Sequence, residues 1–588
     1  MLLLSLKEEL NKALKAAIRA ACGDALQDHE IPFERCVFGP TKQPEHGDLA
    51  TSAALMLAKP LGKNPMQVAQ EIAEKLTAHP YIVSAEAVKP GFVNLRLGPE
   101  AISHVLTLIA RDRESYGDST FGRNAKVLLE FVSANPTGPM HLGHCRHAAT
   151  GDALARILRA ASFIVTTEFY VNDAGVQIQA LGRSFRYRCL AAVGAVLPSE
   201  VEDRADDEGR PRTFFQGEAI QYTGEYLDDF AKDFVKGKTK EELLAMSIED
   251  FSKEARDRNL EMIKRDLASM GVLFDSFVSE KALHDAGAVA ETLEKIREHG
   301  GTYEKDGALF LRTAEFGDEQ DRVMVKSDGA YTYLVPDVAY HHVKFQRAFD
   351  RYINVFGADH GGYPPRLRAG IAAMGHDEKK LDVLLLRLVF LTKNNARVKF
   401  SKRAGNFVAL SDVVEEAGAD ATRWFVLWRS MDSEFEFDMD LARQHSSQNP
   451  VFKVQYAHAR ICSVQRKAVE GGFEPLAIPS IGASRLVAPI EREMVLYLSQ
   501  FPEIVDRSAR ELAVHHIPGY LLGLADLWNR YWSMAKTDES FRILRDDNRD
   551  LTAARLTLAD AIRQVLANGL GLLGISAPNK MSRDEEEG

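Results

Sequence analysis

Residues 128–161 read LLEFVSANPTGPMHLGHCRHAATGDALARILRAA, and this stretch decides the fold. It begins as an apolar strand that ends in Glu130, passes through a loop of Asn, Pro and Gly, and enters a helical pattern. In a doubly wound α/β sheet, ligands bind past the carboxyl ends of the strands, where helix amino termini present N–H groups to anions. His141 and His144, three residues apart at the first helical turn, face one side and predict a phosphate site. Gly143 between them lets a nucleotide approach the backbone.

The same alternation of apolar strands and helices continues along the middle of the chain. Near-continuous apolar strands are typical of a parallel sheet that is covered on both faces. They occur at KVLLEFV (126–132), TTEFYV (166–171), RYINVFG (351–357) and LDVLLLRLVFL (381–391). We predict an α/β doubly wound, Rossmann-like catalytic domain over residues 119–430, with a charged helical insertion at about 183–268.

The two ends of the chain have other patterns. Residues 1–118 mix helical segments with the alternating strand FVNLRL, in which Phe92 and Asn94 share one face, and they predict a small α+β domain. In residues 431–588 strand signals nearly vanish and helical periods dominate. We predict an all-α carboxy-terminal domain there.

Composition narrows the functional class. The chain has 588 residues, a net charge of −11, 45% hydrophobic residues and 27% charged residues, as expected of a large globular protein with several domains. Its apolar runs are shorter than the roughly 20 residues of a membrane span, and its start lacks a signal-type cleavage site, so we expect a cytoplasmic protein without a membrane partner. Its five cysteines lack zinc-site spacing, so no structural zinc and no other protein-held metal is expected. The acidic balance leaves room for a local basic track that binds nucleic acid.

A series of ordered motifs resembles one enzyme family. HLGH (141–144) resembles the HIGH signature of class I aminoacyl-tRNA synthetases, and KFSKR (399–403) resembles their KMSKS loop. FVSANPTGPMHLGH, YVNDAG, KSDGAYTYLVPDVAYH, INVFGADHGGY, SKRAGNFVAL, NPVFKVQYAHARI and DAIRQVLANGLGLLGI extend the resemblance, over nearly the whole chain, to the arginyl-tRNA synthetases of bacterial type. Phe400 stands where the loop signature has Met, and Arg403 stands where it has the final Ser.

The resemblance implies a site that activates an amino acid with ATP. Such activation is an in-line attack of a carboxylate on the α-phosphate, and its catalysis is mostly positioning and charge stabilisation. His141 and His144 would act on the ATP phosphates, and Lys402, helped by Lys399 and Ser401, on the leaving pyrophosphate. A solvated surface loop is the alternative for the lysines. Mg²⁺ would arrive with ATP. Further residues implied in the ATP site are Gly143, Asp359 and His360.

The expected amino acid is arginine, whose planar guanidinium is best held by carboxylates in fork geometry. Glu130 stands out on physical grounds, because a carboxylate ending a buried strand needs a partner, either a protein Arg or the substrate. The resemblance adds Asn135 at the backbone end of the substrate, and Glu280, Tyr333 and Asp337 as further arginine-binding residues. In YLVPD, a helix beginning at the Pro puts Asp337 in its first turn with Tyr333 alongside at i−4. Taken alone, such an Asp is equally well explained as a favourable partner of the helix dipole.

The outer domains carry aromatic side chains suited to unpaired RNA bases, which proteins bind by stacking. The resemblance implies that Phe92 and Asn94 contact the D-loop of a tRNA, although a plain strand face would show the same pattern. In the helical domain, where the family binds the anticodon, we expect contacts from Tyr456, Trp528 and Tyr531. Helix packing is the alternative for these three residues.

With these features, the resemblance implies a class I arginine–tRNA ligase that uses L-arginine, ATP and tRNA(Arg). We expect it to act as a monomer, although no feature of the sequence determines the oligomeric state. Two alternatives remain open. One is an HxGH nucleotidyltransferase that does not use tRNA, for which the helical domain has no purpose. The other is a catalytically inactive tRNA-binding relative, against which the presence of His141, His144 and Lys402 speaks.

Overall fold

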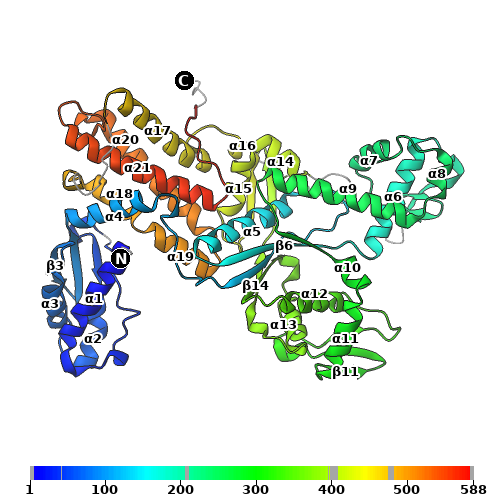
Figure 1. Ribbon diagram of the computed structural model, residues 1–588, viewed down its shortest axis with the longest axis horizontal. Helices are drawn as coiled ribbons and strands as arrows, with labels where there is room; N and C mark the ends of the chain where they lie inside the picture. The colour runs from blue at the N-terminus through cyan, green and yellow to red at the C-terminus, as the bar shows by residue number, and fades with distance from the viewer. Residues whose placement is uncertain are drawn as a thin grey trace.

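The computed structural model describes residues 5–41, 43–205, 209, 211–394, 396–397, 408–473 and 483–582 (Figure 1). A central sheet lies between an arm formed by residues 176–269 on one side and a bundle of carboxy-terminal helices on the other, and the amino-terminal domain lies beside that bundle (Figure 1). Across these described ranges, no helix has both the length and the apolar composition that a membrane span requires.

The central sheet has five parallel strands in the order β10-β6-β5-β14-β15. Their bounds are β5 Lys126–Glu130, β6 Ile164–Val171, β10 Ser276–Ser279, β14 Arg351–Gly357 and β15 Leu381–Leu386. The strand that comes first along the chain among these five, β5, therefore lies in the middle of the sheet. The winding direction reverses between β5 and β14. Such a reversal opens a ligand crevice beyond the carboxyl ends of the two strands. The predicted Rossmann-like class is confirmed.

Helices cover both faces of this sheet, because successive residues of β5 point to opposite faces and each face has apolar side chains to bury. Val127 and Leu129 share a core with α5 (Leu142–Ala160). Leu128 packs on the opposite face, in a cluster with residues of α12 (Leu334–Gln346) and α13 (Pro364–Ala373). Glu130 has the same parity as Leu128 and therefore points toward α12.

The insertion lies between β6 and β10 and has its own apolar core. Its helices are α6 Val176–Ala192, α7 Tyr226–Phe234, α8 Lys240–Ala245 and α9 Ile248–Ser269. It also contains a small antiparallel sheet that the purely helical reading missed, formed by β7 Val201–Ala205, β8 Pro211–Phe215 and β9 Glu218–Ala219. The segment from β10 to α12 contains α10 Glu280–Asp285, α11 Ala288–Glu298, β11 Thr302–Lys305, β12 Ala308–Leu311 and β13 Arg322–Val325.

One predicted strand is wrong in extent. The apolar run 381–391 forms two strands, because the chain leaves the central sheet at Arg387, whose N–H donates to the Met431 carbonyl at 3.0 Å. The second strand belongs to another sheet, made of β16 Val389–Lys393, β17 Ala396–Arg397 and β18 Phe435–Asp438.

The ends of the chain form the predicted α+β and all-α parts. The amino-terminal sheet has the order β1-β2-β4-β3, and β4 buries Val93 and Leu95 as its alternation predicts. Its elements are α1 Leu6–Cys22, β1 Gly39–Pro40, β2 Leu49–Thr51, α2 Ala53–Leu61, α3 Pro65–Leu76, β3 Ile82–Val88, β4 Phe92–Leu97 and α4 Pro99–Asp112. Helices α14 Leu410–Ala417 and α15 Ala419–Leu427 lie within the range 119–430 predicted for the catalytic domain. The carboxy-terminal helices are α16 Met439–Ala442, α17 Pro450–Glu470, α18 Pro489–Leu498, α19 Phe501–Glu511, α20 His516–Thr537 and α21 Arg549–Leu572. The short strand β18 departs from the all-α prediction for residues 431–588, because it pairs with β16.

Candidate active site

The two signature histidines lie together at the amino terminus of α5. His141 is the N-cap residue, and its Nδ1 accepts the Gly143 N–H at 3.1 Å. His144 Nδ1 accepts the His141 N–H at 3.3 Å, and the two rings stack with centroids 3.8 Å apart. A Cβ atom at Gly143 would lie 2.9 Å from the His141 ring, so any larger residue here would displace that ring. The predicted pairing of the two histidines on one side of the helix start is confirmed.

The segment that follows the lysine-rich motif returns to this same place. Ala409 pairs with His141 in an antiparallel bridge, and the Leu410 N–H donates to the Met140 carbonyl at 2.8 Å. Lys399, Ser401 and Lys402, together with the departures Phe400 and Arg403, lie outside the described residues.

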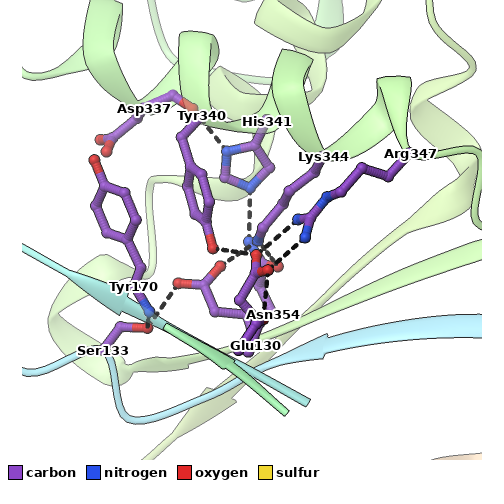
Figure 2. A network of polar contacts seen from close by, with 11 residues as sticks. Glu130, Ser133, Tyr170, Asp337, Tyr340, His341, Lys344, Arg347 and Asn354 are labelled. Atoms are coloured by element: carbon purple, nitrogen blue, oxygen red, sulfur yellow. Dashed lines mark hydrogen bonds and ion pairs between the residues drawn. The ribbon is translucent and has the colours of Figure 1, made fainter. Parts of the chain in front are cut away.

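A buried row of polar side chains crosses the central sheet at one level. Strand register places Glu130 beside Glu168 of β6 on one side and beside Asn354 of β14 on the other. Ser276 of β10 follows next to Glu168 and donates to it at 2.9 Å. We call Glu130, Glu168, Ser276 and Asn354 the polar row. Helix α12 covers it with Tyr340, His341 and Lys344, and Arg347 follows at the end of that helix (Figure 2).

Glu130 is 3% exposed, and its cation is Lys344. The Lys344 ammonium donates to Glu130 Oε2 and, at 3.0 Å, to Asn354 Oδ1. Ser133 Oγ donates to Glu130 Oε1 at 2.8 Å. The partner that a buried carboxylate requires is thus a protein lysine, and not the protein arginine considered from the sequence.

The other members of the polar row are paired as well. Arg347 holds Glu168 with two hydrogen bonds of 2.6 and 2.8 Å, and the Tyr340 hydroxyl donates to Glu168 at 2.7 Å. Burial would raise the pKa of Glu168, but Arg347, Lys344 and Tyr340 hold it below its ordinary value. Asn354 Nδ2 lies 2.7 Å from His341 Nε2, whose ring lies 2.7 Å from the Asp337 carbonyl through Nδ1. Burial, with the charge of Lys344, lowers the pKa of His341 to about 3, so this histidine is neutral.

Above the polar row lies a second group of carboxyl groups, whose pKa values burial raises. Asp337 stands in the first turn of α12, as predicted, and Tyr363 donates its hydroxyl to Oδ2. Burial raises the pKa of Asp337 to about 8, and the charges of Glu280 and Glu130 add to the rise. Burial also raises the pKa of Glu280, against the lowering effect of His284. The Tyr170 hydroxyl points toward Asp337 (Figure 2). These groups form an acidic site suited to a cation.

Asp173 holds the residues on both sides of Glu280. Its carboxylate accepts the Ser279 hydroxyl at 2.8 and 2.9 Å and the Lys281 N–H at 2.9 Å. Arg256 of the insertion lies 3.7 Å from the same carboxylate. Asp173 therefore fixes the start of α10 and does not cap α6, the next helix along the chain, whose N-cap is Gly175.

Two other expected arginine-binding residues lie farther out. Tyr333 is 82% exposed, so its ring lies in solvent and is not packed beside Asp337. The tyrosine that bonds this carboxylate is Tyr363. Asn135 is exposed at the loop after β5, where it donates to Gln177 at 2.7 Å and accepts from Asn172 at 2.8 Å.

The GADHGG motif lies at the carboxyl end of β14, in the crevice predicted for it. Asp359 and His360 form a short 3-10 turn, and their side chains are 84% and 50% exposed. A Cβ atom at Gly357 would lie 2.5 Å from Asp359 Oδ1 and 3.9 Å from His147 Nε2, so the turn is closely packed on α5. Burial lowers the pKa of His147 to about 4.

Comparison with known proteins agrees with this geometry. The models "Arginyl tRNA synthetase N terminal domain", "tRNA synthetases class I (R), catalytic domain" and "DALR anticodon binding domain" match residues 6–97, 104–427 and 454–581. The chain is 39% identical to arginine–tRNA ligase 1 of Halalkalibacterium halodurans, with 98% of this chain and 99% of that protein covered. It is 40% identical to the arginine–tRNA ligase of Thioalkalivibrio sulfidiphilus, with 98% and 100% covered. The chain belongs to the arginyl-tRNA synthetase family.

Solved structures of arginyl-tRNA synthetases share its fold. The Campylobacter jejuni protein superposes with a TM-score of 0.72 at 32% identity, covering 82% of this chain and all of that one. The Thermus thermophilus arginyl-tRNA synthetase superposes with a TM-score of 0.70 at 23% identity, covering 97% of this chain and all of that one, and supports the fold alone.

The residues expected to contact tRNA in this synthetase differ in exposure: some are accessible, and two are buried. Phe92 and Asn94 lie on the outer face of β4, where Phe92 is 37% exposed. Tyr456 is half-buried beneath Arg460, whose guanidinium lies 4.6 Å from the Tyr456 ring centroid and 5.0 Å from that of Trp532. The tRNA contacts expected from Trp528 and Tyr531 are not supported, because the structure buries both residues.

Both of these side chains are buried in the helical core. Trp528 is 1% exposed, and Tyr531 donates its hydroxyl to the Phe541 carbonyl at 2.9 Å. For these two residues the packing alternative holds, because an aromatic residue at helical spacing faces the core when its neighbours on that face are apolar.

Sequence reasoning missed several polar residues of the synthetase that the structure brings together. Those on α12 had a detectable signal, because they follow Asp337 at helical spacing in an otherwise apolar helix. Asn354 and Glu168 had the weaker signal of a polar residue inside an apolar strand. The missed residues are Glu168, Tyr340, His341, Lys344, Arg347, Asn354 and Tyr363.

Proposed function

We propose that this member of the arginyl-tRNA synthetase family activates L-arginine with ATP and transfers it to the 3′ end of tRNA(Arg). The observation that carries the proposal is the acidic site of Asp337 and Glu280, which lies at the same edge of the central parallel sheet as the stacked histidines, since α10 follows β10 and α5 follows β5. A cation site and a phosphate site at one edge of the sheet suit a substrate that carries a guanidinium and reacts with ATP.

The guanidinium would bind at Asp337 and Glu280, where burial raises the pKa of both carboxyl groups and a bound cation would favour their charged forms. Glu130, neutralised by Lys344, would form the floor of this site and add acceptor strength without another unbalanced charge. Asn135 would hold the backbone end of arginine, since it lies at the loop between β5 and the histidines. Tyr333, which is exposed at the mouth, would contact arginine only if the start of α12 closes over it.

ATP would lie along the start of α5. His141 and His144 would contact its phosphates with the exposed N–H groups at the helix end, and Asp359 and His360 would face its nucleoside part from β14. The arginine carboxylate attacks the α-phosphorus, the bond to the bridging oxygen breaks, and pyrophosphate leaves. Lys399, Ser401 and Lys402 would stabilise that leaving group. Mg²⁺ would enter as the ATP complex, since phosphates and water supply most ligands of such an ion.

The outer parts of the chain would hold the tRNA. We propose that residues 1–118 contact its D-loop through Phe92 and Asn94, and that residues 431–588 contact the anticodon. In the latter, Arg460 between Tyr456 and Trp532 offers a cation and aromatic faces to an unpaired base. The catalytic part would then be residues 119–430, with its insertion at about 183–268. We further propose that the protein acts as a monomer in the cytoplasm.

The test is arginine-dependent exchange of pyrophosphate into ATP, with and without cognate tRNA, followed by charging of that tRNA. His144→Ala and Lys402→Ala should each raise the activation free energy by roughly 2 to 4 kcal/mol and so lower kcat, because both groups act on developing charge. The KM for arginine should change little. Tyr456→Ala should weaken tRNA charging and spare the affinity for arginine. Wild-type protein that exchanges pyrophosphate without charging tRNA would favour a nucleotidyltransferase, and protein that binds tRNA without either reaction would favour an inactive relative.

A further inference from the structure

Two stacked tyrosines, one facing the acidic site and the other bonded to the polar row beneath it, differ in one respect. Tyr170 is the last but one residue of β6, and its ring centroid lies 4.1 Å from that of Tyr340, at an interplanar angle of 21°. Both residues are buried. The Tyr340 hydroxyl donates to Glu168 at 2.7 Å, whereas the buried Tyr170 hydroxyl has no hydrogen-bond partner among the described residues.

An unpaired buried hydroxyl is costly and requires an explanation. Four carboxylates lie around this one, and after burial itself the charges of Glu280, Asp337, Glu130 and Asp173 raise the pKa of Tyr170 further. The hydroxyl therefore keeps its proton at every physiological pH. The missing partner must fit among four carboxyl groups and supply a donor or an acceptor. A cation with N–H donors meets both conditions.

We propose that the Tyr170 hydroxyl is a direct ligand of the arginine guanidinium, accepting one of its N–H groups. Figure 2 shows the hydroxyl directed at the Asp337 carboxylate, so its own proton can turn toward that acceptor while its lone pair receives the substrate. Tyr363 already donates to Asp337 Oδ2. Asp337 would then lie between two tyrosine hydroxyls. The Tyr363 hydroxyl positions the carboxylate, and the Tyr170 hydroxyl would bond both the carboxylate and the substrate.

This inference rests on the proposed function, and it can be tested with two matched single-atom changes. Tyr170→Phe deletes the unpaired hydroxyl, and Tyr340→Phe deletes the paired one from the stacked neighbour. Arginine affinity is measured by calorimetry on the full-length protein. The melting temperature is measured on the same protein without ligand. Because a hydrogen bond to a charged group is lost, Tyr170→Phe should weaken arginine binding about ten- to hundredfold. Its melting temperature should stay equal or rise, since no native hydrogen bond is removed.

Tyr340→Phe should show the opposite pattern, with a lower melting temperature and arginine affinity within about threefold of wild type. Agmatine, which keeps the guanidinium and lacks the carboxylate, should lose as much affinity for Tyr170→Phe as arginine does. Arginine binding by Tyr170→Phe within about threefold of wild type, or a loss for arginine without a loss for agmatine, would overturn the assignment. A wild-type protein that does not bind arginine at all would instead overturn the proposed function.

Discussion

At the residue scale, Asp337 links arginine binding to pH. Burial and neighbouring carboxylates raise its pKa from 3.8 to about 8, so it is mostly protonated at neutral pH before the substrate binds. A guanidinium favours the ionised form, and binding must therefore release a proton. Arginine affinity should rise by up to about tenfold per unit between roughly pH 6 and pH 8 and level off above that range. Calorimetry in buffers of different ionisation enthalpy would measure the proton release.

Asp337→Asn provides the control for this linkage. It keeps one acceptor oxygen and removes the titration of Asp337, so arginine affinity should fall and its pH dependence should shrink to the part contributed by Glu280, whose pKa is also raised by burial. The unliganded wild type should also lose stability as the pH rises from about 4 toward 8, because the unfolded carboxyl ionises near 3.8 and the folded one does not. A pH-independent affinity in wild type would show that Asp337 is already ionised.

At the element scale, the start of α10 is positioned by Asp173. Its carboxylate accepts hydrogen bonds from Ser279 and Lys281, on either side of Glu280. Asp173→Ala should therefore let Glu280 move and raise the KM for arginine about tenfold. The kcat and the KM for ATP should change little. Asp275→Ala is the matched control. Asp275 accepts the N–H and hydroxyl of Thr167 at the opposite end of β10, away from the site. Equal KM values for arginine in both variants would count against a positioning role.

Helix α12 and the sheet form one electrostatic unit. Lys344→Met removes the cation of a buried pair and leaves Glu130 unpaired, which should cost about 3 to 5 kcal/mol of stability. The double variant Glu130→Leu/Lys344→Met should recover most of this stability while remaining poor in arginine binding. Denaturant midpoints of the three proteins measure the effect. A single variant as stable as wild type would mean that water reaches Glu130.

The same elements show how far sequence reasoning extends. The strands and α5 were predictable because apolar runs and helical periods are local properties. Glu130 was recognisable as a carboxylate in need of a partner, but Lys344 is 214 positions away, and their meeting depends on strand order and on which face α12 turns to the sheet. Tyr456 and Trp528 are both aromatic residues on helices of one domain, and only helix packing leaves the first half-buried and places the second in the core.

At the scale of the whole molecule, Arg423 of α15 joins three parts of the chain. It donates to the Leu573 carbonyl after α21 at 2.7 Å, to the Met270 carbonyl after α9 at 3.0 Å, and to Asp152 of α5. The side chain is fully buried, and a Cβ atom at Gly574 would lie 2.3 Å from it. The helical domain, the insertion and the signature helix are thus fixed to one guanidinium.

Arg423→Lys should therefore lower stability by about 2 to 4 kcal/mol, since a point-charge ammonium cannot satisfy three divergent acceptors. Arg443→Lys is the control, because Arg443 pairs with Glu416 at 2.9 Å on the surface and should change stability by less than about 0.5 kcal/mol. Denaturant unfolding with limited proteolysis would show whether the helical domain separates first. Identical unfolding of both variants would exclude Arg423 as the junction.

The pairing of Glu130 with Lys344 also limits how this sequence can evolve. A lineage that replaces either residue alone passes through a protein with an uncompensated charge in its core, and few such intermediates keep a folded population large enough to persist. A simultaneous apolar replacement escapes that barrier but removes a carboxylate from beneath the arginine site. Arg443 and Glu416 at the surface can be replaced one at a time by drift. At the centre of the sheet, replacing one residue of the pair costs stability, and replacing both costs arginine binding.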